Sequence, residues 1–168
     1  CSSDLRGDPA GWRSVGRVLR QLRRDPRAVT ERRELLLFAD GGARGNPGPA
    51  AIGAVLLDPT TDPPDRLAVV SERIGETTNN VAEYRAVIAG LEAALAFPAR
   101  VMRVRADSML VIEQLRGVWK VRQPHLRPLH ARARELLAAY DEVDLAHVRR
   151  EFNTDADALV NAALDAAG

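Results

Sequence analysis

The chain has 168 residues, of which 46% are hydrophobic and 28% are charged, and its formal net charge is +1 at pH 7. A chain of this size buries one substantial core, so one main domain is expected. The apolar runs are too short to span a membrane, no secretory signal pattern is present, and the only cysteine, Cys1, excludes an internal disulfide. These features predict a soluble protein of a reducing compartment, the cytoplasm.

Residues 1–34 form an Arg-rich stretch, with nine Arg against five Asp and Glu and a net charge of +4. We expect an N-terminal extension that contains a helix here, and a main domain over residues 35–168. The apolar face of that helix consists of Trp12, Val15, Leu19 and Leu22. Its composition favours a helix docked on the domain over a phosphate-binding arm, while docking to a partner helix stays open. Because the chain begins with Cys1 rather than Met, we expect a fragment, a trimmed chain or a processed product.

Three strands are predicted in the first half of the main domain. An apolar run over residues 35–38 predicts a buried strand that ends at Asp40 and leads into a glycine-rich loop. Residues 51–57 and 67–74 predict two more strands, joined by a proline-rich turn. The short connections between these strands indicate an antiparallel meander.

Helices alternate with strands in the second half. Residues 77–80, Thr-Thr-Asn-Asn, are good capping residues and predict the start of a helix. The expected elements are a helix over 81–96, a strand over 101–106, helices over 108–116 and 126–140, a strand over 143–148 and a last helix capped by residues 153–155. This order predicts an α/β fold in which helices cover a mixed sheet.

Three acidic residues occupy positions that face the interior. Asp40 ends the first predicted strand and Asp107 follows the fourth, so both emerge at one sheet edge if these strands are neighbours. Glu83 shares a helical face with Val87 and Leu91, which weakens the alternative of a surface ion pair. A buried carboxylate is costly unless a partner or a metal ion binds it.

A fourth acid, Asp157, shares a face of the last helix with Val160 and Leu164. Asp155 is the alternative, but it lies closer to the helix cap, where Asp has an ordinary structural role. Four carboxylates that meet cannot all be ionised without cations. Their oxygens suit Mg²⁺ or Mn²⁺, and two such ions about 4 Å apart are a known arrangement for phosphoryl displacement.

Four segments of the chain resemble, in order, the motifs of type 1 ribonuclease H from the bacterial and archaeal group that lacks the long basic protrusion. They are ADGGARGNPGPAAIGAVL, TTNNVAEYRAVIAGLEAAL, RADSMLVIEQLRGVWKV and FNTDADALVNAAL. The resemblance implies a five-stranded mixed sheet with helices on both faces. It implies a metal site made of Asp40, Glu83, Asp107 and Asp157.

The same resemblance implies an endonuclease that hydrolyses the RNA strand of RNA–DNA hybrids with two Mg²⁺ or Mn²⁺ ions and leaves 5′-phosphate and 3′-hydroxyl ends. A non-catalytic nucleic-acid-binding module with the same fold is the alternative from another class. A related nuclease that acts on double-stranded RNA or junction DNA is the closer alternative. We expect a monomer.

Substrate contacts are also implied by the resemblance. Asn46 and Thr78 match positions that hold a phosphate of the DNA strand, and Asn80 matches one that reads the minor groove. The expected substrate-binding residues are Gly41, Asn46, Thr78, Asn79, Asn80, Trp119, Lys120 and Asn153. The alternatives are helix capping for Asn79 and Asn80, and packing for Trp119.

Two departures from the family pattern lower the expected efficiency. Many relatives carry a histidine in the loop before the last helix, whereas residues 149–152 here are Arg-Arg-Glu-Phe. Glu151 is the hypothetical stand-in for that histidine. The basic protrusion is reduced to residues 117–123, so weak hybrid binding is expected unless the Arg-rich extension compensates.

Overall fold

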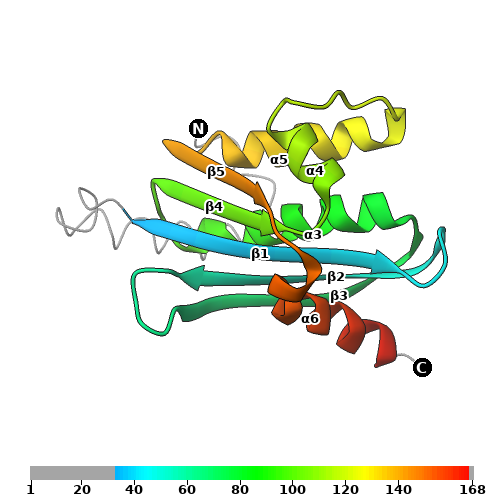
Figure 1. The fold of residues 1–168 in the computed structure, drawn as a ribbon, viewed down its shortest axis with the longest axis horizontal. Coiled ribbons are helices and arrows are strands. Elements are labelled where there is room, and N and C mark those ends of the chain that lie inside the picture. The colour runs from blue at the N-terminus through cyan, green and yellow to red at the C-terminus, as the bar shows by residue number, and fades with distance from the viewer. Residues whose placement is uncertain (1–32, 167–168) are drawn as a thin grey trace.

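The computed structural model describes residues 33–166, which form a five-stranded mixed sheet with the strand order β3-β2-β1-β4-β5 (Figure 1). The strands are β1 (Glu34–Ala43), β2 (Gly48–Asp58), β3 (Asp65–Thr77), β4 (Val101–Ala106) and β5 (Glu142–His147). β1, β2 and β3 form the predicted antiparallel meander, and β4 and β5 run parallel to β1. The first and fourth strands are neighbours, which is the condition for Asp40 and Asp107 to emerge at one edge.

Helices cover both faces of this sheet, as predicted (Figure 1). The helices are α3 (Asn79–Ala93), α4 (Met109–Leu115), α5 (Arg127–Leu137) and α6 (Thr154–Asp165), with short 3₁₀ turns η2 (Ala94–Ala96), η3 (Pro124–Leu126) and η4 (Arg150–Phe152). The helix predicted over 126–140 is shorter than expected, because it begins with a 3₁₀ turn and ends at Leu137.

The main core lies between the sheet and the layer of α3, α4 and α5. Leu35 and Leu37 of β1 and Val87 and Leu91 of α3 are all at most 1% exposed. α6 packs on the opposite face, directly against β2, where a Cβ on Gly53 would overlap the backbone of α6. The alternation of side chains along β1 and β2 thus supplies two apolar faces, and Gly53 permits the close contact with α6.

β1 extends beyond the predicted end of the first strand. Pairing with β4 stops at Ala39, but pairing with β2 continues from Asp40 to Ala43. The prediction that Asp40 ends its strand is therefore wrong for the hairpin with β2, although it holds for the edge shared with β4. The antiparallel partner continues the ladder because β2 returns directly alongside β1.

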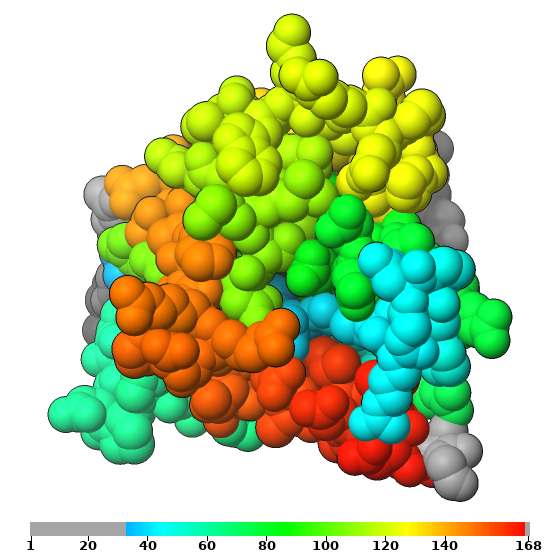
Figure 2. All heavy atoms as spheres, turned by 45° about the vertical axis from the view of Figure 1, so that its right-hand side comes forward, coloured from blue at the N-terminus to red at the C-terminus, as the bar shows by residue number. Residues whose placement is uncertain are grey.

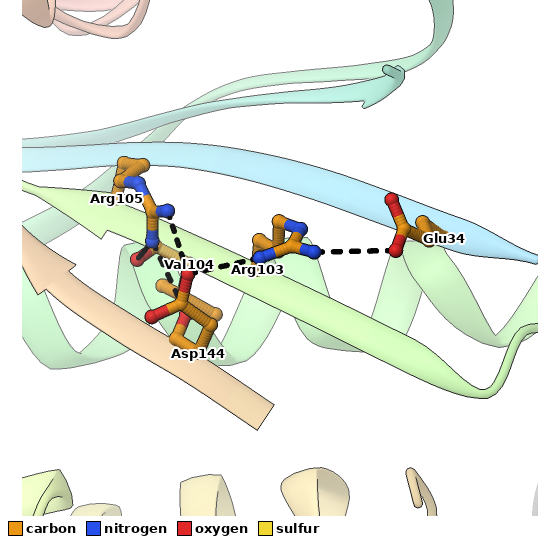
Figure 3. A network of polar contacts seen from close by, with 5 residues as sticks. All are labelled: Glu34, Arg103, Val104, Arg105 and Asp144. Carbon is orange, nitrogen blue, oxygen red and sulfur yellow. Dashed lines mark hydrogen bonds and ion pairs between the residues drawn. The ribbon is translucent and has the colours of Figure 1, made fainter. Parts of the chain in front are cut away.

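A network of opposite charges joins β1, β4 and β5 on one sheet face (Figure 3). Arg103 lies between Glu34 and Asp144, with contacts of 3.2 Å to each carboxylate, and Arg105 contacts Asp144 at 2.8 Å. The hydrogen bond from Arg105 is the main cause that lowers the pKa of Asp144. These pairs are partly exposed, so each contributes at most about 1 kcal/mol to stability.

The predicted Arg-rich extension lies almost entirely outside the described residues. Its boundary at residue 34 falls at the first residue of β1. Every helix within residues 33–166 is too short or too polar to span a membrane.

Candidate active site

Asp40 and Asp107 meet because of strand register. Ala39 of β1 pairs with Ala106 of the parallel strand β4, and each is followed by one of the acids. Asp40 is 8% exposed, and the side chain of Asp107 is 11% exposed. Parallel neighbours in register therefore place two shielded carboxylates at one edge of the sheet.

Glu83 joins them from α3. Thr78 caps this helix, since its Oγ1 accepts a hydrogen bond of 3.4 Å from the amide of Val81. A Cβ on Gly41, the residue after Asp40, would overlap the backbone of Ala82 and Glu83, so only glycine allows α3 to approach β1 this closely. The missing side chain of Gly41 thereby places Glu83 next to the other acids.

One carboxylate oxygen from each of Asp40, Glu83 and Asp107 lies within 4.8 Å of the others. Asp157 of α6 is half-buried and flanks this cluster, close enough to interact with Asp40. Its Oδ2 also accepts a hydrogen bond of 3.4 Å from Asn161. Three of the four predicted acids thus place a carboxylate oxygen in one cluster, and the fourth, Asp157, lies next to it.

Asp155, the alternative to Asp157, lies at the surface, where it pairs with Arg66 of β3 at 3.3 Å. Val160 and Leu164 are buried on the face that Asp157 shares, as the helical spacing predicts. The choice of Asp157 as the inward acid of the last helix is therefore supported by its position.

Burial and like charge favour the protonated forms of two acids. Burial, followed by the charges of Asp107 and Asp157, raises the pKa of Asp40 to about 8. Burial also raises the pKa of Glu83 to about 7, and the charge of Asp107 adds to this effect. A hydrogen bond from Ser108 and the charge of Arg150 act on the pKa of Glu83 in the opposite direction. The cluster therefore resists holding its full negative charge without a cation.

The donor set fits a hard divalent cation. All three clustered donors are carboxylate oxygens, the ligand type that Mg²⁺ and Mn²⁺ prefer, and no thiolate or imidazole takes part. A cation between the acids would remove the repulsion that raises the pKa of Asp40 and Glu83. Asp40, Glu83 and Asp107 are thus the residues that would hold a metal ion, with Asp157 at the margin.

The elements that carry the acids border a depression of the surface. Figure 2 shows β1 at its bottom, bordered by the loop after β1 in cyan, α3 in green, the start of α4 in lime and α6 in red. A cavity of about 630 Å³ lies elsewhere, between the end of α5 and β5, and its lining includes none of the four acids.

Two asparagines tie the loop after β1 to the start of α3. The Oδ1 of Asn46 accepts a hydrogen bond of 3.1 Å from the amide of Asn79, and the Oδ1 of Asn79 accepts one of 2.9 Å from the amide of Ala43. Since Thr78 is the cap, the capping alternative for Asn79 and Asn80 is wrong. The structure thus brings Asn46, Thr78 and Asn79 together beside the acids.

Known proteins share this fold and much of this sequence. A family model described as "Reverse transcriptase-like" matches residues 38–163. The ribonuclease HI of Halobacterium salinarum is 48% identical over 128 residues, which cover 76% of this chain and 63% of that protein. The solved N-terminal RNase H domain of Rv2228c from Mycobacterium tuberculosis, a fusion with maltose-binding protein, is 45% identical with a TM-score of 0.76, covering 80% of this chain and 96% of that one.

The chain belongs to the type 1 ribonuclease H family. Another family structure, LC11-RNase H1 in complex with an RNA/DNA hybrid, is 41% identical with a TM-score of 0.73, covering 79% of this chain and 98% of that one. The chain spans only 36% of the bifunctional protein Rv2228c, to which it is 46% identical over 134 residues. The shared region is therefore the ribonuclease H domain.

The loop before α6 differs from the expectation for this ribonuclease H domain. Glu151 is not among the clustered acids; its side chain is 65% exposed and lies 3.7 Å from Arg149. Arg150 instead approaches the cluster, with its Nε 3.8 Å from Oδ2 of Asp107. Arg150 was not predicted, because its sequence neighbours do not reveal which of two adjacent arginines faces the acids.

Asn153 makes an unexpected contact. It occupies the N-cap position of α6, within the predicted capping residues, but its side chain makes no capping hydrogen bond. It is 1% exposed and its Nδ2 donates a hydrogen bond of 2.9 Å to the carbonyl of Ala39, the residue before Asp40. Its Oδ1 is buried without a hydrogen-bond partner among the described residues. This ribonuclease H domain therefore uses Asn153 to connect the start of α6 to β1.

Trp119 and Lys120 lie between α4 and η3. Trp119 is 44% exposed, and Lys120 is exposed as well. Packing therefore covers only part of Trp119, and nearly half of its surface is accessible.

Proposed function

We propose that this chain is an endonuclease that hydrolyses the RNA strand of RNA–DNA hybrids with two divalent metal ions, Mg²⁺ or Mn²⁺. The observation that carries the proposal is the cluster of Asp40, Glu83 and Asp107, on elements that border a depression of the surface. Membership of the ribonuclease H family supports it, as does the relative that was solved with an RNA/DNA hybrid.

Divalent cations, when bound, would supply positive charge for activating a water molecule and for stabilising a leaving 3′ oxygen, and the expected products carry 5′-phosphate and 3′-hydroxyl ends. Asp40 of β1 and Asp107, directly after β4, would hold them. Glu83 contributes from α3, and the hydrogen bond from Ser108 favours its charged form. Asp157 adds negative charge on the α6 side, where Asn161 bonds to one of its oxygens.

Polar residues around the acids orient the hybrid. Asn46 and Thr78 hold a phosphate of the DNA strand at the start of α3, and Asn80 contacts the minor groove. Trp119 and Lys120 add an exposed ring and a positive charge. Such contacts recognise the shape of the duplex and its 2′-hydroxyls rather than the base sequence.

The test compares two acids of similar chemistry. Asp107→Asn removes a clustered ligand, and Asp155→Asn, the matched control, removes an exposed carboxylate of α6. We expect Asp107→Asn to lower cleavage of a labelled hybrid by at least about 100-fold with binding retained. Asp155→Asn keeps cleavage within about twofold, because surface ion pairs contribute little. Equal cleavage by both variants contradicts the proposal.

A substrate panel separates the alternatives. A non-catalytic binding module would have no use for clustered like charges that face a phosphate backbone, so the acids disfavour it. Parallel assays on hybrid, double-stranded RNA and junction DNA, each with Mg²⁺ and Mn²⁺, distinguish the related nucleases. Sedimentation tests the expected monomer, and the cytoplasmic location stays a prediction.

A further inference from the structure

Gln114 of α4 is a buried amide that bonds to two separate parts of the molecule. It is 4% exposed. Its Oε1 accepts a hydrogen bond of 2.5 Å from the hydroxyl of Tyr84, and its Nε2 donates one of 3.2 Å to the backbone carbonyl of Lys120. Burial raises the pKa of Tyr84, so the phenol keeps its proton and acts as the donor. The two partners together fix which end of the amide faces each of them.

Neighbouring helices hold Gln114 in place. Tyr84 is fully buried on α3 and directly follows Glu83 in sequence. The ring of His130, on α5, packs edge-on against Tyr84 with a centroid separation of 6.5 Å. The Nε2 of His130 also lies 3.0 Å from the backbone oxygen of Gln114. The amide is therefore fixed relative to the helix that carries Glu83.

The other partner of Gln114 belongs to the segment that bears Trp119 and Lys120. The amide of Trp119 bonds to the carbonyl of Glu113 at 3.1 Å, and the carbonyl of Lys120 bonds to Gln114. A cavity of about 510 Å³ is lined by this segment and by Leu110 and Gln114 of α4. Main-chain hydrogen bonds to Glu113 hold Val118 and Trp119 to the end of α4, and the side chain of Gln114 holds the next residue, Lys120.

We propose that Gln114 is a positioning residue that holds Trp119 and Lys120 at a fixed place relative to Glu83. The inference rests on the proposed function, because it concerns how a rigid hybrid contacts the acids and this segment at once. A hybrid that contacts both the acids and the segment with Trp119 and Lys120 binds well only if the distance between them is fixed in the free protein. In a domain with a short segment in place of a basic protrusion, this buried amide adds a side-chain anchor at Lys120 to the main-chain bonds at Val118 and Trp119.

Two variants separate positioning from stability. Gln114→Leu removes both hydrogen bonds, whereas Tyr84→Phe removes the bond between Tyr84 and Gln114 but keeps the one to Lys120. We expect Gln114→Leu to raise KM for the hybrid about 5- to 10-fold with kcat within about twofold. Tyr84→Phe is expected to leave KM within about twofold, even where it lowers stability to a similar degree.

A second readout does not depend on cleavage. The chain has two tryptophans, Trp12 and Trp119. In a Trp12→Phe background, fluorescence therefore reports Trp119 alone. We expect Gln114→Leu to increase acrylamide quenching of Trp119, and Tyr84→Phe to leave it unchanged. Should Gln114→Leu fail to fold, Gln114→Glu replaces it, because it keeps the acceptor for Tyr84 and removes the donor to Lys120.

Unchanged KM and quenching in the Gln114 variants, or equal changes in the Gln114 and Tyr84 variants, would overturn the inference. If no variant and no parent protein cleaves the hybrid, the proposed function fails. Trp119 quenching then still decides whether Gln114 fixes the segment.

Discussion

The two ends of the β1–β4 strand pair carry charge differently, although the same two strands build both. At one end, Arg103 alternates with Glu34 and Asp144 on a partly exposed face (Figure 3). At the other end, Asp40 and Asp107 meet as like charges with little exposure to solvent. The pKa of Asp144 is lowered, whereas that of Asp40 is raised to about 8. Opposite charges stabilise the sheet at the first end, and like charges at the second end disfavour full ionisation of the acids without a cation.

The largest effect is expected from neutralising Asp40, at the end of the strand pair where the two like charges meet. Asp40→Asn should lower cleavage at least about 100-fold, because it removes a proposed metal ligand. The same change should raise the metal-free stability at pH 8 by about 2 kcal/mol, because a repelled buried charge is removed.

The sign of the pH dependence follows from the raised pKa. Between the ordinary value of 3.8 and about 8, folded Asp40 binds a proton that the unfolded chain has released. Metal-free stability of the parent protein therefore falls as pH rises through this window, and Asp40→Asn flattens the fall. Urea unfolding of the parent protein and of Asp40→Asn, with a metal chelator at pH 5 and pH 8, measures the fall in stability of each. A steeper fall in the variant contradicts the account of the end where the like charges meet.

The next largest effect is expected from a change of side-chain shape rather than of charge. Gly41→Ala places a Cβ against the backbone of α3, so we expect a loss of about 2–3 kcal/mol and a displaced Glu83. Gly42→Ala is the matched control, because its Cβ would meet only Val160 at an ordinary 3.8 Å. Thermal unfolding and hybrid cleavage of both variants test this. Similar behaviour of the two would show that close approach of α3 does not position Glu83.

Arg150 offers an intermediate test. Its charge lies near Asp107 and acts on Glu83, so Arg150→Gln should lower cleavage about 10-fold, with a smaller effect at high salt. Arg149→Gln changes the neighbouring arginine, which contacts Glu151 instead, and should change cleavage less than about threefold. Steady-state cleavage at two salt concentrations compares them, and the reverse order of effects contradicts this assignment.

The smallest effect is expected at the end of the strand pair where Arg103 contacts Glu34 and Asp144. Asp144→Asn removes the partner of Arg103 and Arg105 and should cost about 1 kcal/mol at neutral pH, with cleavage unchanged. Because its folded pKa is lowered, the stability that Asp144 contributes is present at neutral pH and is lost as pH falls through its folded pKa. Urea unfolding at pH 7 and pH 3 measures this, and a large loss of cleavage would show that the two ends are coupled.

Periodicity in the sequence was sufficient to predict the acids. Asp40 and Asp107 follow apolar runs, and their meeting required only that the first and fourth strands be neighbours. Glu83 and Asp157 share helical faces with buried apolar residues, which predicted that both point inward. The antiparallel meander was also predictable, because the short connections between its three strands leave few alternative pairings.

The polar contacts around the acids could not be predicted in this way. Asn153 reaches Ala39 and Asn79 reaches Ala43, contacts that span 114 and 36 residues and depend on how loops lie over the sheet. A capping sequence does not reveal which of its side chains forms a hydrogen bond to a neighbouring strand instead of to its own helix. The same holds for Arg150, because a short loop directs adjacent side chains to different sides.

Cleavage of a hybrid with different labels on its RNA and DNA strands tests the central claim most directly. The account predicts that the parent protein, with Mg²⁺ or Mn²⁺, cuts the RNA strand into products with 5′-phosphate ends and leaves the DNA strand intact. It predicts that Asp107→Asn binds the same hybrid without cutting it. A parent protein that binds the hybrid in either metal and leaves both strands whole would contradict the account.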